Sequence, residues 1–214
     1  MANRTHVTTI FAMAVTALVS ANTSTFAQSP DSRTPTPVEV RGGTASFDVD
    51  TNIPALSVHG KSTALEARVR VRQGATGPEL DQIEATVPVK TLVTGMGLRD
   101  EHMRRYIFTT QDGQTPDVKF VAGKTTCAKS GGNQSTCQLA GDLVIRGTSR
   151  PFVMALKVTE DSGSFHASGD AIVKLSTYGI AQPSQLGVRT SDEVKLKLDF
   201  TARPGPVATT GATR

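Results

Sequence analysis

Alternation of apolar and charged residues with a period of two is the feature that most limits how this chain can fold. Over residues 63–72, leucine, alanine and valine alternate with glutamate and arginine, and over residues 194–200 valine, leucine and phenylalanine alternate with lysine and aspartate. Successive side chains of a strand point to opposite faces, so each run predicts a half-buried strand. The same alternation recurs over residues 83–89, 137–145 and 152–158.

Shorter candidate strands bring the expected total to eight or nine, and they cover residues 44–50, 54–60, 117–126 and 164–175. Turn-forming residues separate most of the runs, as at Gly131-Gly132 and Ser162-Gly163. Many antiparallel strands with one apolar face each predict a sandwich or a closed barrel. An immunoglobulin-type sandwich is disfavoured, because the chain has no Trp and its two cysteines are close in sequence.

One segment departs from this alternation. Over residues 98–108, charged residues cluster and Met103, Tyr106 and Ile107 fall at helical spacing, which predicts a short amphipathic helix. Between strands, such a helix would serve as a lid or plug at one end of the sheet, or would cover an open edge.

The amino terminus has the pattern of a secretory signal. Arg4 precedes an apolar stretch over residues 10–21 that is too short to span a bilayer, and small residues at 25 and 27 favour cleavage after Ala27, with Ala21 as the second candidate. An uncleaved anchor helix is the alternative. We therefore expect residues 1–27 to be a signal peptide and the protein to be exported.

Composition predicts the domain boundaries. Residues 28–42 and 203–214 are rich in Pro, Ser, Thr and Gly, so we expect a flexible linker and a disordered tail. Between them, residues 43–202 show no internal repeat and no change of composition, which indicates one domain.

An exported protein meets an oxidising environment, in which its two cysteines, Cys127 and Cys137, can form a disulfide. They flank the Gly131-Gly132 turn between two strand-like runs, so they are expected to form a disulfide across a hairpin. Two free thiols are the alternative. A metal site is not predicted, because His59, His102 and His166 are isolated in the sequence.

Charge and aromatic content exclude other classes of protein. The formal net charge is only +4 and the basic residues form no run, while the chain has no Trp and two Tyr, so nucleic-acid binding is disfavoured. A membrane-spanning barrel shows a similar alternation, but it carries aromatic girdles that this sequence lacks. The apolar strand faces are therefore expected to point inward.

Enzyme motifs are absent from the sequence. There is no G-x-S-x-G, P-loop or HExxH pattern, and the glycines at 95 and 97 precede a short helix outside any βαβ unit. Asp100, His102 or His166 could serve a small hydrolase or isomerase, but Asp100 and His102 lie two residues apart on a helix and would point in different directions. The sequence therefore favours a protein that is not an enzyme.

Three stretches resemble the YceI-like family of periplasmic proteins. The first is Leu98-Arg99-Asp100-Glu101-His102-Met103-Arg104 with Phe108 and the later Pro116-Asp117-Val118-Lys119-Phe120. The second is GDLVIRGTSRP over residues 141–151, and the third is Tyr178-Gly179-Ile180. Departures are Met103 for the usual Leu, Ile107 for an acidic residue and Thr115 for an aromatic one, and the match around residues 44–61 is weak.

The resemblance implies an all-β fold, an antiparallel eight-stranded lipocalin-like barrel with one short helix. It also implies a ligand, an isoprenoid or similar long-chain lipid such as a quinone, with no other cofactor. The barrel could instead be filled by its own side chains, as in a stress-related interaction or structural protein. Apolar side chains expected to face the interior and bind the ligand are Phe47, Leu65, Val69, Val71, Ile83, Val87, Phe120, Leu143, Ile145, Phe152, Met154, Leu156, Leu196, Leu198 and Phe200.

Three arginines of the helix, Arg99, Arg104 and Arg105, are expected near the barrel mouth, where a charge-assisted hydrogen bond would select a headgroup. The protein is expected in the periplasm, or secreted, as a monomer or homodimer with transient membrane contact.

Overall fold

The computed structural model describes residues 35–205, and the expected signal peptide lies outside them. Within these residues, ten antiparallel strands, one α-helix and three shorter helical turns follow one another. Their bounds are β1 Thr36–Thr51, β2 Ser57–Gln73, β3 Pro78–Val87, η1 Val89–Thr91, α1 Gly97–Met103, η2 Arg104–Phe108, β4 Val118–Ala122, β5 Thr125–Gly131, β6 Gln134–Ile145, β7 Thr148–Asp161, β8 Ser164–Lys174, η3 Leu175–Tyr178, β9 Ser184–Gln185 and β10 Val188–Pro204.

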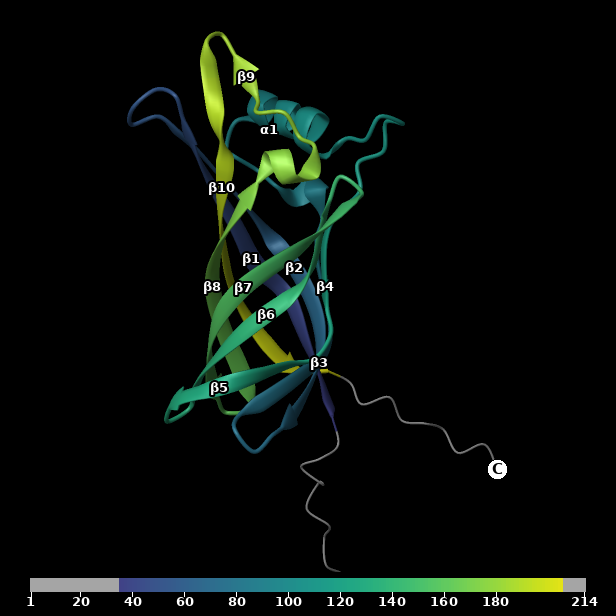
Figure 1. Ribbon diagram of the computed structural model, residues 1–214, viewed down its shortest axis with the longest axis vertical. Coiled ribbons are helices and arrows are strands. Elements are labelled where there is room, and N and C mark those ends of the chain that lie inside the picture. The colour runs from purple at the N-terminus through teal and green to yellow at the C-terminus, as the bar shows by residue number, and fades with distance from the viewer. Residues whose placement is uncertain (1–34, 206–214) are drawn as a thin grey trace, which may run out of the picture. The chain divides into compact units, whose positions relative to one another are not determined.

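The strands form a closed barrel with eight positions (Figure 1), which confirms the predicted fold. The order around the barrel is β1, β2, β3, β4, β6, β7, β8 and β10, and β10 pairs with β1 to close it. β5 takes the same position as β4, because both lie between β3 and β6. β9 is a two-residue strand that pairs only with β10.

A β-bulge separates β4 from β5 within the single strand expected over residues 117–126. Ala122 lies opposite Gly141 and Cys127 lies opposite Cys137, so one strand advances by five residues where its partner advances by four. The extra residue interrupts the ladder and bends the strand, as bulges do. β5 and β6 then form the hairpin that was expected around Gly131-Gly132.

Both expected tails are shorter than the sequence predicted. β1 begins at Thr36, inside the segment 28–42, and its first residues pair with β2 and β10 so that Val38 and Val40 are buried. At the other end β10 continues to Pro204. The linker and tail predictions are therefore wrong for residues 36–42 and 203–204, where pairing with distant strands outweighs a loop-like composition. Residues 28–34 and 206–214 lie outside the described residues.

Residues 57–60 of the strand predicted over residues 54–60 belong to β2, which continues to residue 73, whereas residues 54–56 lie in the β1–β2 connection. The polar residue Ser62 interrupts the apolar pattern, yet it faces inward and is 1% exposed. Its hydroxyl lies 2.6 Å from that of Thr91, and this partner stabilises a buried polar group.

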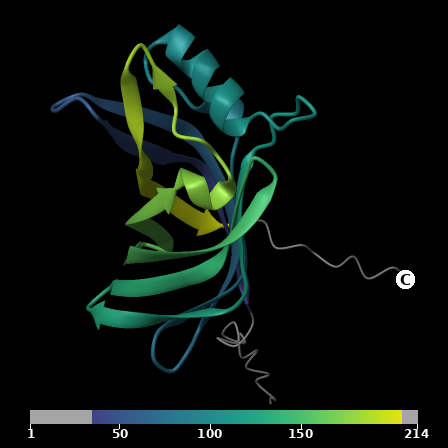
Figure 2. The same ribbon diagram turned by 45° about the horizontal axis from the view of Figure 1, so that its top comes forward.

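α1 and η2 confirm the helix expected over residues 98–108, and they lie across one end of the barrel, together with β9 and the β1–β2 connection (Figures 1 and 2). We call this end the mouth. The opposite end contains the start of β1 and the end of β10, where Val38, Val40 and Ala202 form a small buried cluster. Of the residues described, none lies in a helix long and apolar enough to cross a membrane.

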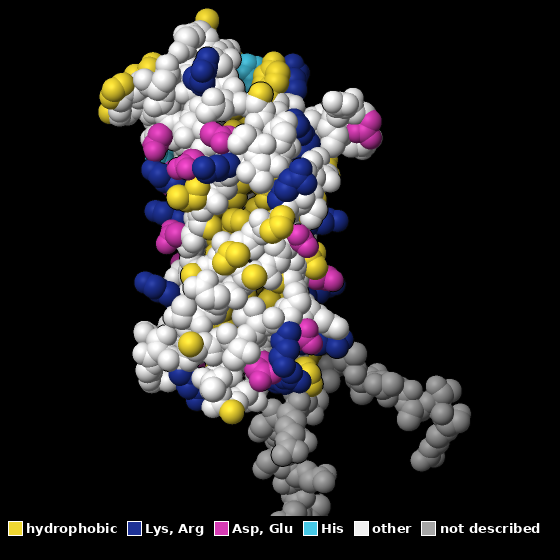
Figure 3. Space-filling model, viewed as in Figure 1, with side chains coloured by type: hydrophobic (Ala, Val, Ile, Leu, Met, Phe, Trp, Pro, Cys, Tyr) yellow, Lys and Arg dark blue, Asp and Glu magenta, His cyan; other side chains and the backbone are white. Residues whose placement is uncertain are grey.

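β7 and β8 separate toward the mouth. Residues 155–161 of β7 pair with residues 164–170 of β8. The first half of β7 is not hydrogen-bonded to β8. η3 lies beside the opening, where Arg150 Nε donates to the carbonyl of Thr177 (2.9 Å). Hydrophobic side chains are visible in the middle of this barrel wall between bands of charged residues (Figure 3).

Candidate functional site

The inner face of the barrel carries the residues that the alternation predicted. In β10, the even-numbered residues from 194 to 200 are half-buried while their odd-numbered neighbours are exposed. Since side chains alternate across a strand, the half-buried set points inward. A solid core would bury these side chains fully, so their partial exposure indicates free space inside the barrel.

A cavity of about 1200 Å³ occupies this space. All fifteen residues expected on the inner face line it. Six of them are buried and nine are only half-buried, the latter being Phe47, Val69, Val71, Val87, Phe120, Phe152, Leu196, Leu198 and Phe200. The volume is somewhat larger than the usual range of small-molecule sites, roughly 300–1,000 Å³. The cavity contradicts the alternative of a barrel filled by its own side chains.

Aromatic rings line the bore. Phe120 of β4 and Phe152 of β7 pack edge to face, with ring centroids 6.0 Å apart. Across the barrel, Phe47 of β1 lies over Gly60 of β2, where any side chain would overlap the ring. Rings and aliphatic side chains thus form an apolar wall on several sides of the cavity.

The disulfide predicted between Cys127 and Cys137 is present and faces this cavity. The two residues are directly opposite each other in β5 and β6 and are almost fully buried. A covalent link therefore holds the β5–β6 hairpin closed on one side of the bore.

The mouth adds cavity-lining residues that the sequence did not assign to the ligand. These are Leu56, Met96, Leu98, Met103, Tyr106 and Leu186. They come from the β1–β2 connection, the helical segment and the β9–β10 turn, three regions without period-two alternation. The helical spacing of Met103 and Tyr106 did predict that they share one apolar face of the helix. That apolar face is the sequence signal from which their contact with the cavity could have been predicted.

The three candidate headgroup arginines do not share one environment. Arg99 lines the cavity, and its guanidinium donates to the hydroxyl and carbonyl oxygens of Thr94 (2.8 and 2.7 Å). Arg104 instead donates to the carbonyl of Leu92 (3.0 Å), and Arg105 pairs with Glu101 one helical turn away.

Arg104 and Arg105 lie in η2 at the mouth, but unlike Arg99 they do not line the cavity. Arg104 points toward the end of η1, and Arg105 lies on the exposed face of the helix. Headgroup binding by Arg99 stays a prediction.

Asp100 is a structural residue of this segment. It is 7% exposed, and its carboxylate accepts hydrogen bonds from the backbone N–H and the hydroxyl of Thr94. Burial opposes ionisation, but these hydrogen bonds and the charges of Arg104 and Arg99 outweigh it and hold the pKa of Asp100 below its ordinary value. The ionised carboxylate thus fixes the start of α1.

The histidines considered for acid–base chemistry are separate from Asp100. His102 packs edge-on against Tyr106, with ring centroids 5.8 Å apart, and lines the cavity. His166 lies on the outer wall, where its Nε2 is 3.3 Å from Asp199 Oδ1. Neither arrangement combines a nucleophile with an oriented base.

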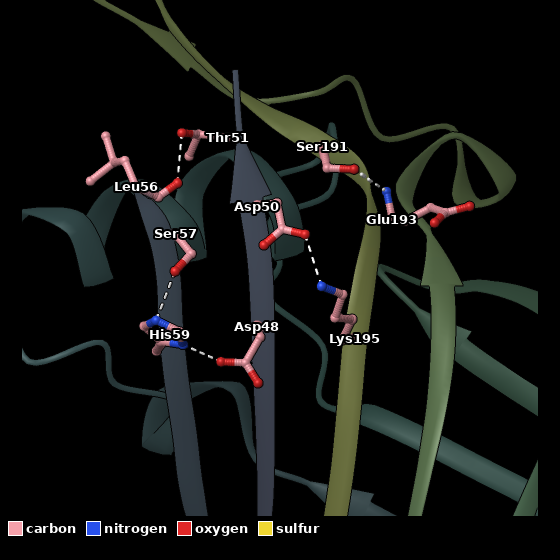
Figure 4. Close-up of polar contacts among 9 residues, drawn as sticks. All are labelled: Asp48, Asp50, Thr51, Leu56, Ser57, His59, Ser191, Glu193 and Lys195. Atoms are coloured by element: carbon pink, nitrogen blue, oxygen red, sulfur yellow. Dashed lines mark hydrogen bonds and ion pairs between the residues drawn. The ribbon is translucent and has the colours of Figure 1, made fainter. Parts of the chain in front are cut away.

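A third histidine, His59, lies between Ser57 and Asp48 in the order of a hydrolase relay (Figure 4). Ser57 Oγ is 2.8 Å from His59 Nε2, and the other ring nitrogen contacts Asp48 across the β1–β2 pair. The His59 side chain is 68% exposed on the outer wall. Because catalytic charge stabilisation depends on a water-excluded site, this exposed relay does not make a catalytic centre.

Comparison with known proteins identifies this architecture. The sequence matches the YceI-like domain over residues 16–202. None of the curated protein sequences compared with the chain matches it. Among solved structures, Burkholderia cenocepacia BcnA is similar at 17% identity and a TM-score of 0.56, over 74% of this chain and 95% of that one.

Two further structures share the fold. One is described as a polyisoprenoid binding domain from Saccharophagus degradans implicated in plant cell wall breakdown. It has 10% identity and a TM-score of 0.59 over 80% of this chain and all of its own. The other is the Campylobacter jejuni YCEI protein, with 17% identity and a TM-score of 0.57 over 72% of this chain and 90% of its own.

Proposed function

Because the chain belongs to the YceI-like domain family, we propose that it binds a polyisoprenoid or a similar long-chain lipid inside its barrel. The open apolar bore is the observation that carries this proposal. A bore lined by aliphatic and aromatic side chains suits a slender apolar guest, because such a guest needs burial rather than directed hydrogen bonds. The fold shared with a polyisoprenoid binding domain supports the same class of ligand.

Solvent shielding would supply most of the affinity. Removing one five-carbon isoprene unit from water contributes up to about 4 kcal/mol, at about 0.8 kcal/mol per CH₂. One charge-assisted hydrogen bond to a headgroup contributes about 1.5–3 kcal/mol. The tail would therefore hold the ligand, and Arg99 at the mouth would select its head. A quinone with an isoprenoid tail belongs to the same ligand class.

We further propose that the protein is exported and works in the periplasm as a carrier, without enzymatic activity. The signal-like amino terminus supports export, and the disulfide is typical of oxidising compartments. Binding would keep a long apolar chain away from water until it is released at a membrane. We expect the carrier to be a monomer or a homodimer.

Lipid extraction tests the proposal. The chain from Gln28 onward is purified without detergent, extracted with organic solvent and analysed by mass spectrometry. We expect a long-chain isoprenoid or similar lipid in stoichiometric amount. An empty extract from a folded preparation would contradict the proposed function.

Neighbouring residues of β10 provide matched variants for this experiment. Leu198 faces the bore and Lys197 faces solvent. Leu198→Asn places an amide against the guest and should lower the lipid content, whereas Lys197→Asn should leave it unchanged. Equal lipid content in both variants would mean that the lipid is held outside the bore.

A further inference from the structure

Large apolar side chains are exposed at the mouth of the barrel. We call six of them the apolar rim: Ile53, Leu56, Met96, Leu98, Tyr106 and Leu186. They belong to the β1–β2 connection, the helical segment and the β9–β10 turn, which are far apart in sequence and lie at the same end of the barrel (Figures 1 and 2). Three segments far apart in the sequence thus contribute exposed apolar side chains to the same end of the barrel.

Leu186 shows most clearly that the apolar rim is not part of the core. It is 97% exposed and has a φ of 51°, next to Gly187 at 80°, in the turn between β9 and β10. Positive φ is unfavourable for a bulky side chain, and Asn, Asp or Gly are preferred in such turns. Neither burial in the core nor turn geometry therefore accounts for a leucine at this position.

The apolar rim is continuous with the cavity. Five of its six residues also line the cavity, Ile53 being the exception. An apolar guest leaving the bore would cross these side chains before it reached water. A medium that could receive such a guest directly must itself be apolar, as the acyl region of a bilayer is.

The charges around the apolar rim match an anionic lipid surface. Over residues 92–108 and 181–190, four arginines accompany two acidic residues, a formal charge of +2. Asp100 is buried against Thr94, and Glu101 is paired with Arg105. Residues 51–57 and 182–188, which carry Ile53, Leu56 and Leu186, contain no charged residue. Uncharged tips flanked by arginine suit insertion between anionic headgroups.

We propose that the apolar rim docks the mouth of the barrel onto an anionic phospholipid bilayer. The tips insert at the level of the headgroups, and the bore opens toward the acyl chains. Transfer of a lipid through this contact rests on the proposed function, whereas docking itself does not require a bound guest.

Vesicle flotation tests the docking, with vesicles of equal parts phosphatidylcholine and phosphatidylglycerol and the same chain from Gln28 onward. Leu98→Ser combined with Leu186→Ser should weaken binding about a hundredfold, since burial of each leucine contributes at least about tenfold. The matched control combines Val153→Ser with Ile172→Ser, which are 61% and 57% exposed on the barrel wall. The control should bind within about twofold of the unmodified protein.

Insertion can be followed separately because the chain contains no Trp. Leu186→Trp should give a blue-shifted emission on adding the vesicles, and Val153→Trp should not. Unmodified protein that ignores the vesicles, a rim variant that binds normally, or equal binding to phosphatidylcholine alone would overturn the proposal. A dimer in solution that the rim substitutions dissociate would also overturn it, in favour of a second copy. Docking together with an empty lipid extract would refute only the proposed function.

Discussion

Two leucines on the inner barrel face provide a matched test of whether the bore is open. Leu156 of β7 and Leu198 of β10 both line the cavity and pack in or against the cluster that contains the disulfide, but Leu156 is only 5% exposed whereas Leu198 is half-buried, so more of the Leu198 side chain faces free space. Truncating a well-packed leucine costs about 2.7–5 kcal/mol, because a new cavity adds to the lost transfer free energy. Leu198 already adjoins free space, so its truncation should cost only part of the transfer term, about 1 kcal/mol.

The assay is urea unfolding of protein refolded from denaturant in the absence of lipid. We expect Leu156→Ala to lower the free energy of unfolding by about 3 kcal/mol or more, and Leu198→Ala by about 1 kcal/mol. Lys197→Ala on the outer face of β10 is the control, with a change within about 0.5 kcal/mol. If Leu198→Ala costs as much as Leu156→Ala, the bore is packed and the reasoning is wrong.

Three further predictions concern single features of the barrel. Replacing Cys127 and Cys137 together by Ala should lower the free energy of unfolding by about 3 kcal/mol in the chain-entropy model, measured against the oxidised protein; an unchanged urea midpoint would contradict it. The pKa of Asp100 is lowered by folding, so its stabilisation is complete above the unfolded pKa of about 3.9 and is lost as pH falls through the lower folded pKa. Asp100→Asn should therefore reduce the acid sensitivity of unfolding, and an identical pH profile would argue against the Thr94 contacts. Gly60→Ala should displace the Phe47 ring into the bore and lower lipid content in the extract, and full occupancy would show that the ring moves elsewhere.

The barrel could be predicted because its inner and outer faces differ in chemistry. Where charged residues face solvent, as in β10, the alternation predicts both that the segment is a strand and which of its side chains point inward. That is why all fifteen residues expected inside line the cavity. The disulfide was also predictable, since its cysteines flank a local turn.

Other features depend on partners that are distant in sequence. Residues 36–42 have the composition of a linker, but pairing with β2 and β10 makes them part of strand β1. Ser62 is buried because Thr91 provides a hydrogen-bond partner. The directions of Arg104 and Arg105 depend on how α1 is placed over the mouth, and the residues of the apolar rim come together only in the folded chain.

Dependence of affinity on tail length tests the central claim most directly. Polyprenyl phosphates of increasing length share one headgroup, so competition binding to the lipid-free protein separates the contribution of the bore from that of the head. An open apolar bore predicts that each added isoprene unit strengthens binding until the cavity is filled, after which the affinity levels off. Affinity that is the same for the shortest and the longest tails would contradict the claim.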